Sequence, residues 1–130
     1  WRWNALANYN LAGLGSDRHW LNNTSIGGAL RWEDRAAIGF LGAAPDADGV
    51  IRTLDKNKPA YDQARTYVDL NASYRFKLFS DRISGRLQLN VRNAFEGGRL
   101  QTVSVNPDGS PANFRIIDPR QFILTASFDL

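Results

Sequence analysis

The chain has 130 residues, a formal net charge of +3, no cysteine and a mean hydropathy of −0.39. Without cysteine, a disulfide scaffold, a thiolate metal site and a cysteine nucleophile are excluded. No apolar run approaches the ~18 residues of a membrane helix, which excludes helical membrane proteins but not membrane β-barrels, whose strands alternate apolar and polar residues. The arginines are scattered at alternate strand positions, so we expect no nucleic-acid partner.

Five stretches alternate apolar and polar side chains at period two, which predicts strands with one apolar and one polar face. We expect these strands at about residues 1–11, 22–41, 66–77, 84–95 and 120–130. The apolar positions of the last strand are Phe122, Leu124, Ala126, Phe128 and Leu130. Its length matches the about 9–11 residues with which a tilted strand crosses a bilayer.

The connections between these strands alternate in length. Short turns are expected at 13–17 and 80–82, and long loops, rich in Pro, Gly, Asp and Asn, at 42–65 and 96–119. Outer-membrane barrels have short periplasmic turns and long extracellular loops. The connections of a soluble β-sandwich need not alternate between short and long, although a β-sandwich too can end on an amphipathic strand. The pattern therefore favours an all-β fold, an antiparallel transmembrane β-barrel.

Five strands do not complete such a barrel. Bacterial single-chain barrels have an even number of strands, and hydrocarbon does not tolerate an open sheet edge. The sequence also begins at Trp1, with no initiator methionine and no signal peptide. We therefore expect residues 1–130 to be the C-terminal part of a larger barrel. Trp1, Trp3 and Trp32 are expected at the membrane–water interface on its extracellular side.

The second half of the chain contains four stretches that resemble the C-terminal end of TonB-dependent outer-membrane receptors. They are YVDLNASY at 67–74, LQLNVRNAF at 87–95, NPDG at 106–109 and PRQF at 119–122. In that family the penultimate strand typically carries an Asn-Val/Leu-x-Asn-aromatic ending, and the last strand typically begins Pro-Arg-x-Phe. The family usually ends on Phe, whereas this chain ends on Leu130, with Phe128 two residues before it.

The resemblance implies a barrel of about 22 strands with a plugged lumen, in the outer membrane of a Gram-negative bacterium. Such a receptor takes up a scarce substrate (siderophore, cobalamin, glycan or peptide) with energy delivered through the TonB complex. The family's plug domain and TonB-binding segment are N-terminal and are not in this chain, so no residue here is assigned to TonB. The other implied partners are outer-membrane lipid and the barrel-assembly machinery.

The same resemblance gives two sets of candidate residues. Phe122, Leu124, Ala126, Phe128 and Leu130 would form the motif read by the barrel-assembly machinery and also the lipid-facing wall. Arg75, Arg86 and Arg92 fall on the expected lumen face, where they would contact an anionic substrate or the plug. The alternative for these arginines is that they simply solvate the barrel wall.

No enzyme, metal site or cofactor is expected. His19 is the single histidine and has no companion for a metal site or a catalytic triad. Asp46-Ala47-Asp48-Gly49 imitates the start of a calcium loop, but the twelfth position is Asn57 where such a loop requires Glu, so a plain turn is expected.

Two other functions remain open. One is a passive porin-type barrel, which a plug-like domain upstream would exclude. The other is a soluble β-sandwich module that binds carbohydrate through exposed tryptophans, which solubility without detergent would favour.

Overall fold

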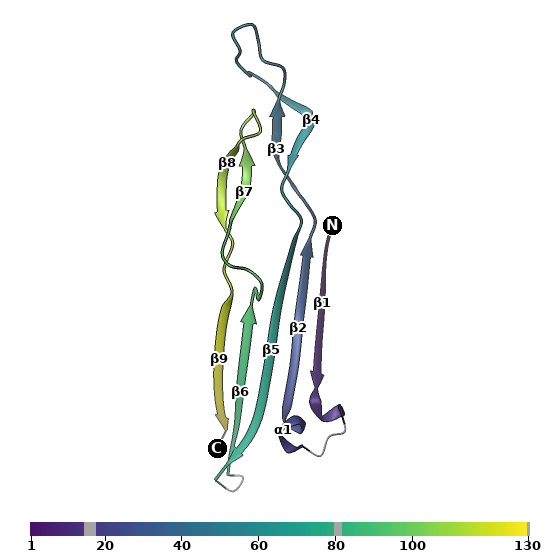
Figure 1. Ribbon diagram of the computed structural model, residues 1–130, viewed down its shortest axis with the longest axis vertical. Coiled ribbons are helices and arrows are strands. Elements are labelled where there is room, and N and C mark those ends of the chain that lie inside the picture. Colours follow the sequence, from purple (N-terminus) through teal and green to yellow (C-terminus); the bar gives the residue numbers. More distant parts are fainter. Residues whose placement is uncertain (15–17, 80–81, 130) are drawn as a thin grey trace.

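The computed structural model describes residues 1–14, 18–79 and 82–129. The chain is 63% strand and 6% helix, and all its strand pairs are antiparallel, so the all-β prediction is confirmed. None of the sheets closes on itself within these residues. The molecule is a long five-stranded sheet from one end of which two hairpins extend (Figure 1). Leu130 and parts of the two expected short turns, 15–17 and 80–81, lie outside the described residues.

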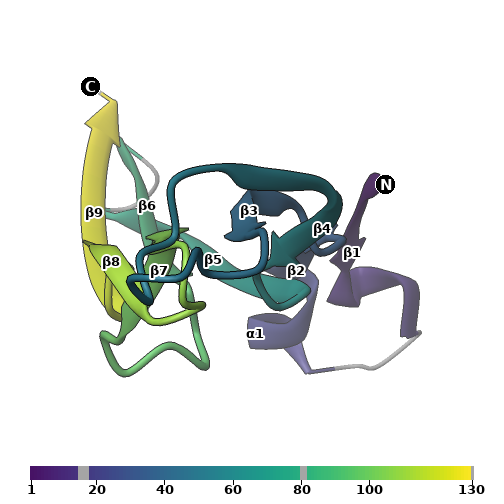
Figure 2. The same cartoon turned by 90° about the horizontal axis from the view of Figure 1, so that it is seen from above.

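The five-stranded sheet has the order β1-β2-β5-β6-β9. Its strands are β1 (Arg2–Asn10), β2 (Thr24–Glu33), β5 (Arg65–Leu78), β6 (Ile83–Arg92) and β9 (Gln121–Asp129). A 3₁₀ turn, η1 (Leu11–Leu14), and a short helix, α1 (His19–Asn22), lie between β1 and β2 at the end of the sheet opposite the hairpins (Figure 1). Seen along its length the sheet is curved, bending round from β9 to β1 (Figure 2).

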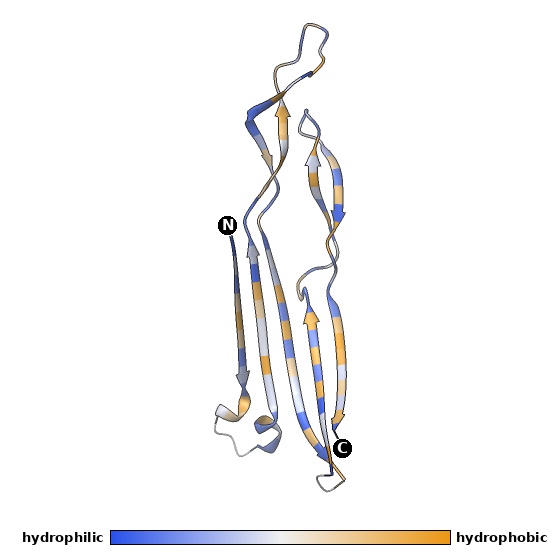
Figure 3. Ribbon diagram, turned by 180° about the vertical axis from the view of Figure 1, so that it is seen from behind, coloured by the Kyte–Doolittle hydropathy of each residue, from blue (hydrophilic) through white to orange (hydrophobic). Residues whose placement is uncertain are grey.

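The strand register places apolar side chains of neighbouring strands in common rows. In one row Leu70 pairs with Gly28 on one side and with Val91 on the other, and Val91 pairs with Phe122. Because side chains alternate along each strand, every second row is apolar, and Figure 3 shows the alternation of hydropathy along β5 and β6. The apolar face thus consists of Trp3, Ala5, Ala7, Tyr9, Ile26, Gly28, Leu30, Trp32, Val68, Leu70, Ala72, Tyr74, Phe76, Leu87, Leu89, Val91, Phe122, Leu124, Ala126 and Phe128.

The intervening rows form the polar face. It carries mainly amides, hydroxyls and charges, interrupted by Leu6, Ala29, Tyr67 and Ile123. This face is the hollowed one, since Asn8 of β1 and Asn90 of β6 line the same depression although two strands separate them. At Gly27 the absence of a side chain allows Asn71 to reach Asn8 across β2, because a Cβ there would lie 1.8 Å from the Asn8 Oδ1 atom.

No hydrophobic core is formed by the described part of the chain. None of its large side chains is fully buried, and the buried apolar residues, Tyr67, Ala94 and Ile117, lie where the hairpins leave the sheet. The apolar face remains open, with Leu124 67% exposed and Leu70, on the central strand, 46% exposed. A sheet in water normally buries such a face against a second layer. The described residues provide no second layer.

The hairpins correct two sequence predictions. The expected loop 42–65 and the end of the expected strand 22–41 contain β3 (Ala37–Gly42) paired with β4 (Leu54–Tyr61). The expected loop 96–119 contains β7 (Leu100–Val105) paired with β8 (Pro111–Ile116). The Gly-rich and Pro-rich stretches inside them are hairpin turns, in which Gly49 N–H donates to Asp46 O and Gly109 N–H to Asn106 O. Both glycines have positive φ, 77° and 87°.

Local hydrogen bonds explain where the strands of the sheet end. The expected strand 22–41 breaks after Glu33 because the Asp34 carboxylate accepts the Arg35 N–H and the Asp62 carboxylate accepts the Ala36 N–H. The expected strand 84–95 ends at Arg92, because Asn93 takes a positive φ of 49° and its N–H donates to the Asp69 carboxylate. Phe95 therefore leaves the alternation and is 83% exposed.

Asp62 connects the sheet to both hairpins. Its carboxylate accepts hydrogen bonds from Ala36 N–H at 2.6 Å and Gln101 Nε2 at 2.9 Å, and it forms an ion pair with Arg65 Nη2 at 2.9 Å. The Asp62 and Arg65 side chains are only 5% and 9% exposed. Arg115 extends this network by donating to the Gln101 side-chain oxygen at 2.7 Å. The starts of β3, β5 and β7 therefore meet at one buried carboxylate.

Asp62→Ala should destabilise the fold by about 3 kcal/mol, because it leaves the Arg65 charge buried with its nearest partner removed. The free energy of unfolding by denaturant, measured by tryptophan fluorescence, checks this. Asp48→Ala is the matched control, since the Asp48 side chain is 80% exposed and should contribute little. Equal effects of the two substitutions would contradict the role of Asp62.

Candidate functional site

The candidate residues of the terminal strand share one surface. Phe122, Leu124, Ala126 and Phe128 lie on β9 on the apolar face, paired with Val91, Leu89, Leu87 and Gly85 of β6. Their side chains are exposed, with Phe122 at 65% and Phe128 at 58%. The fifth candidate, Leu130, lies outside the residues that the structure describes. The four described residues thus present a continuous apolar strip at an edge of the sheet.

Aromatic rings lie near both ends of the apolar face. Trp3 and Trp32 stack near the hairpins, with ring centroids 6.4 Å apart. At the opposite end Tyr74 stacks on Phe76 at 6.2 Å, and Phe76 meets Phe128 edge-on at 6.1 Å. From Thr66, the partner of Trp32, to Tyr74 there are eight residues along β5, or about 27 Å at about 3.4 Å per residue.

The middle of the polar face is uncharged and internally hydrogen-bonded. Ser25 and Ser73 share a hydrogen bond of 2.8 Å between their hydroxyls, and the Gln88 side chain donates to Asn90 at 2.9 Å. Asn71 donates to Asn8 at 3.4 Å across β2. These groups line a hollow of about 450 Å³. Its amides and hydroxyls suit water or a polar chain.

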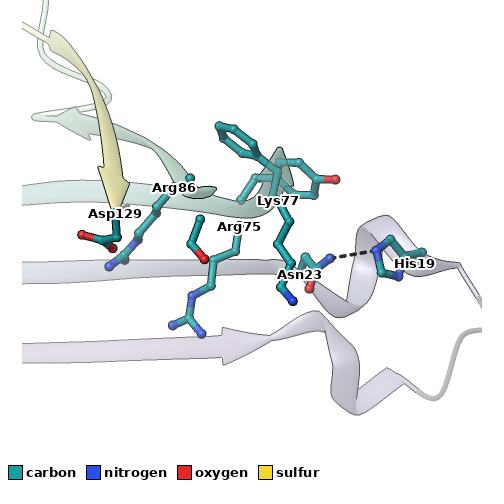
Figure 4. Close-up of a pocket in the computed structure, with 10 residues that line it drawn as sticks. His19, Asn23, Arg75, Lys77, Arg86 and Asp129 are labelled. Carbon is teal, nitrogen blue, oxygen red and sulfur yellow. Dashed lines mark hydrogen bonds between the residues drawn. The ribbon is translucent and has the colours of Figure 1, made fainter. Parts of the chain in front are cut away.

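Positive charge gathers at the α1 end of the polar face. Arg75 of β5 and Arg86 of β6 are directly opposite each other in the register. With Lys77, they line a hollow of about 890 Å³ whose rim includes His19 of α1, Asn23 just after α1 and Asp129 of β9 (Figure 4). The His19 Nε2 atom lies 3.4 Å from the side-chain Nδ2 atom of Asn23. We call this hollow the cationic hollow.

The three candidate arginines do not form one site. Arg92 pairs with Gln121 near the opposite end of β6 and lines a different hollow, beside Asp69. Six residues, or about 20 Å of strand, separate it from Arg86. Arg75 and Arg86 are brought together by register, which the sequence pattern alone does not provide. His19 was missed as their neighbour because a four-residue helix gives no periodic signal, whereas the alternation already places Lys77 on the polar face.

The calcium-like stretch forms a closed turn. The Asp46 carboxylate accepts the N–H groups of Asp48 and Val50 and also bonds the Arg52 guanidinium. The Arg52 contact, helped by these N–H groups, holds the pKa of Asp46 below its ordinary value. Its oxygens are therefore engaged within the turn. Among the described residues, no group of three or more His, Cys, Asp or Glu side chains is placed to hold a metal ion.

The two hairpins contact each other as well as the sheet. Gly42 of β3 donates its N–H to Pro107 O at 2.7 Å, in the turn between β7 and β8. Val105 packs against Gly39, where a Cβ would lie 3.0 Å from its Cγ2 atom. With the Asp62–Gln101 hydrogen bond, these contacts make the hairpins one surface beyond the end of the sheet.

The chain matches no protein-family model, no curated protein and no solved structure. Neither helical segment in the described residues is long and apolar enough to cross a membrane.

Arg52→Gln should raise the pKa of Asp46 toward its ordinary value of 3.8. Because the folded-state pKa is lowered, the contact stabilises the turn above that ordinary value, and the contribution is lost as the pH falls through the folded pKa. An NMR titration of the Asp46 carboxyl carbon measures the shift. Lys56→Gln removes an equal charge from the same hairpin and should leave the Asp46 pKa nearly unchanged. A calcium-dependent shift of the Asp46 signal at neutral pH would contradict the closed turn.

Proposed function

We propose that this chain is the C-terminal part of the barrel of a TonB-dependent outer-membrane receptor that takes up a scarce substrate. The observation that carries the proposal is the apolar face, which is continuous across five strands in register and faces nothing within the described chain. Lipid fits such a face when the opposite face is polar, since a barrel wall separates hydrocarbon from a wet interior.

The dimensions of the apolar face support the membrane assignment. The about 27 Å between its aromatic ends becomes about 21 Å across the bilayer when strands tilt by about 40°, close to the apolar band of about 25 Å on outer-membrane barrels. The stacked pair Trp3–Trp32 at one end and the cluster of Tyr74, Phe76 and Phe128 at the other match the two aromatic girdles of such barrels.

The position of the connections supports an orientation. Both long connections, now resolved into hairpins, extend from one end of the sheet, and α1 lies at the other end (Figure 1). In an outer-membrane barrel the long connections are extracellular. The hairpins would then form part of the outer surface that meets the substrate, and the cationic hollow would lie on the lumen side near the periplasm.

The edges of the sheet support a larger barrel. Neither the outer edge of β1 nor that of β9 pairs with another strand in the described residues. Unpaired backbone groups are not tolerated in hydrocarbon, so further strands of the parent protein would pair with both edges. The exposed strip of β9 would serve as lipid-facing wall and as the segment that the barrel-assembly machinery reads, which is the role that the resemblance to the receptor family implies.

A passive porin would share the same sheet, so the parent protein has to be measured. Its intact mass in the outer-membrane fraction of the source cells should be several-fold larger than 14.5 kDa, and its migration should change on heating. Peptide mapping should find a plug domain on the N-terminal side. A heat-modifiable barrel without a plug would favour the porin, and a soluble species of 14.5 kDa would refute both membrane assignments.

Leu124→Arg in the parent protein should reduce its heat-modifiable, membrane-inserted yield, because a charge facing the middle of the bilayer costs about 2–4 kcal/mol. Thr125→Arg is the matched control, since Thr125 is the next residue of β9 but lies on the polar face, opposite Gln88. The yield is read from heated and unheated samples of the outer-membrane fraction. If Leu124→Arg inserts as well as Thr125→Arg does, the apolar face does not face lipid.

A further inference from the structure

The cationic hollow contains an electrostatic conflict. Arg75 and Arg86 form a direct cross-strand pair, and like charges in that position are destabilising. Neither guanidinium makes a hydrogen bond or an ion pair with any residue in the described ranges. Arg65, by contrast, is paired with Asp62 at 2.9 Å. Within the described residues, a cation is thus paired where the sheet meets the hairpins, and two adjacent cations in the hollow have no ion-pair partner.

The surroundings of the pair leave an excess of positive charge. Of the described residues that line the hollow, Asp129 is the sole acid, set against the two arginines (Figure 4). Asp129 pairs with Ser84 in the register, and it is Ser127 that stands opposite Arg86. Asp129 is therefore a diagonal neighbour of Arg86, and one acid stands against two arginines among the described residues of the hollow.

The shape of the polar face indicates an elongated occupant. Arg86 lines both the cationic hollow of about 890 Å³ and the neighbouring hollow of about 450 Å³, so the two depressions adjoin. The second is lined by Asn71, Asn90 and Gln88, whose amides keep hydrogen-bonding groups beyond the bonds among themselves, and these groups match those of a peptide backbone. Arg75 and Arg86 lie side by side at one end of these adjoining hollows, which suits carboxylates near one end of an extended segment.

We propose that the cationic hollow docks an acidic polypeptide segment, with its carboxylates on Arg75 and Arg86 and its backbone along the amide-lined hollow. A carboxylate accepts charge-assisted hydrogen bonds from the guanidinium fork. A lipid phosphate is the less suitable occupant, because the arginines lie on the face opposite the apolar one. The contacts that the inference names all lie on the polar face, so a failed docking test would leave the membrane assignment of the apolar face standing.

The test uses the parent protein in zwitterionic detergent micelles and a fluorescein-labelled decapeptide of alternating glutamate and serine. Fluorescence anisotropy should detect binding that weakens as salt is raised. A peptide with glutamine in place of glutamate should not bind. Arg75→Gln and Arg86→Gln should each lower the affinity about tenfold, the ratio expected for losing one charge-assisted hydrogen bond. Arg92→Gln, on the same face but outside the hollow, should change it less than about twofold.

A second measurement separates docking from a structural role. Without peptide, Arg75→Gln should raise the midpoint of thermal unfolding, because it relieves the repulsion from Arg86. A lowered midpoint would show that the guanidinium stabilises the sheet and would overturn the inference. So would equal affinity of all three arginine variants for the glutamate peptide.

Competition identifies the class of occupant. Inorganic phosphate and vesicles of anionic phospholipid should displace the glutamate peptide only weakly. If phosphate displaces it at equal concentration of charge, the hollow is a small-anion site. If the vesicles displace the peptide and bind less tightly to the Arg75→Gln and Arg86→Gln variants, the occupant is a lipid headgroup. Either result would overturn the proposal of a polypeptide segment.

Discussion

The structure depends on a strand register that keeps all apolar side chains on one face of an open sheet. A shift of one residue between any two strands would move the apolar side chains of one strand to the polar face. The register holds from β2 to β9, since Ile26 pairs with Ala72, Ala72 with Leu89 and Leu89 with Leu124. This arrangement removes little apolar surface from water within the chain itself, because Leu124 and Leu70 remain 67% and 46% exposed. The stabilisation that a soluble sheet obtains from its core must therefore come from whatever covers this face.

The polar face is divided along its length, and the division has an energetic basis. In its middle, side chains satisfy one another, as Ser25 does with Ser73. Near the hairpins, the charges on Arg65 and Asp62 are paired and buried, where an unpaired charge would cost several kcal/mol. At the α1 end Arg75 and Arg86 are solvated, and solvation makes their repulsion tolerable. Two adjacent cations without an ion-pair partner in the described residues can persist only where water or a binding partner reaches them, and both side chains are exposed.

The sheet could be predicted from sequence because period-two alternation is a local signal. The stretch 66–77, for example, corresponds to β5 at Arg65–Leu78. The hairpins could not be predicted from the sequence, because their strands contain residues that are unfavourable in β-strands. β4 contains Pro59, Lys56 and Lys58, and it is a strand because β3 pairs with it, with an irregular register at Pro59. The turn residues were recognised, but as parts of long loops. The ion pair of Asp62 with Arg65, and the approach of Gln101 to it, rest on contacts that no local pattern encodes.

The same long-range contacts decide how the hairpins can act. A hairpin alone in water is marginally stable, yet here β3–β4 and β7–β8 contact each other through Gly42 and Pro107 and meet the sheet at Asp62. The Arg120 N–H, just before β9, donates to Glu96 O, and Glu96 in turn forms an ion pair with Arg99. Each hairpin is thus fixed at its base by hydrogen bonds to the segment that enters or leaves the sheet. A ligand bound between them would contact a surface whose two halves are already held together. Less conformational entropy would therefore be lost on binding than with two free loops.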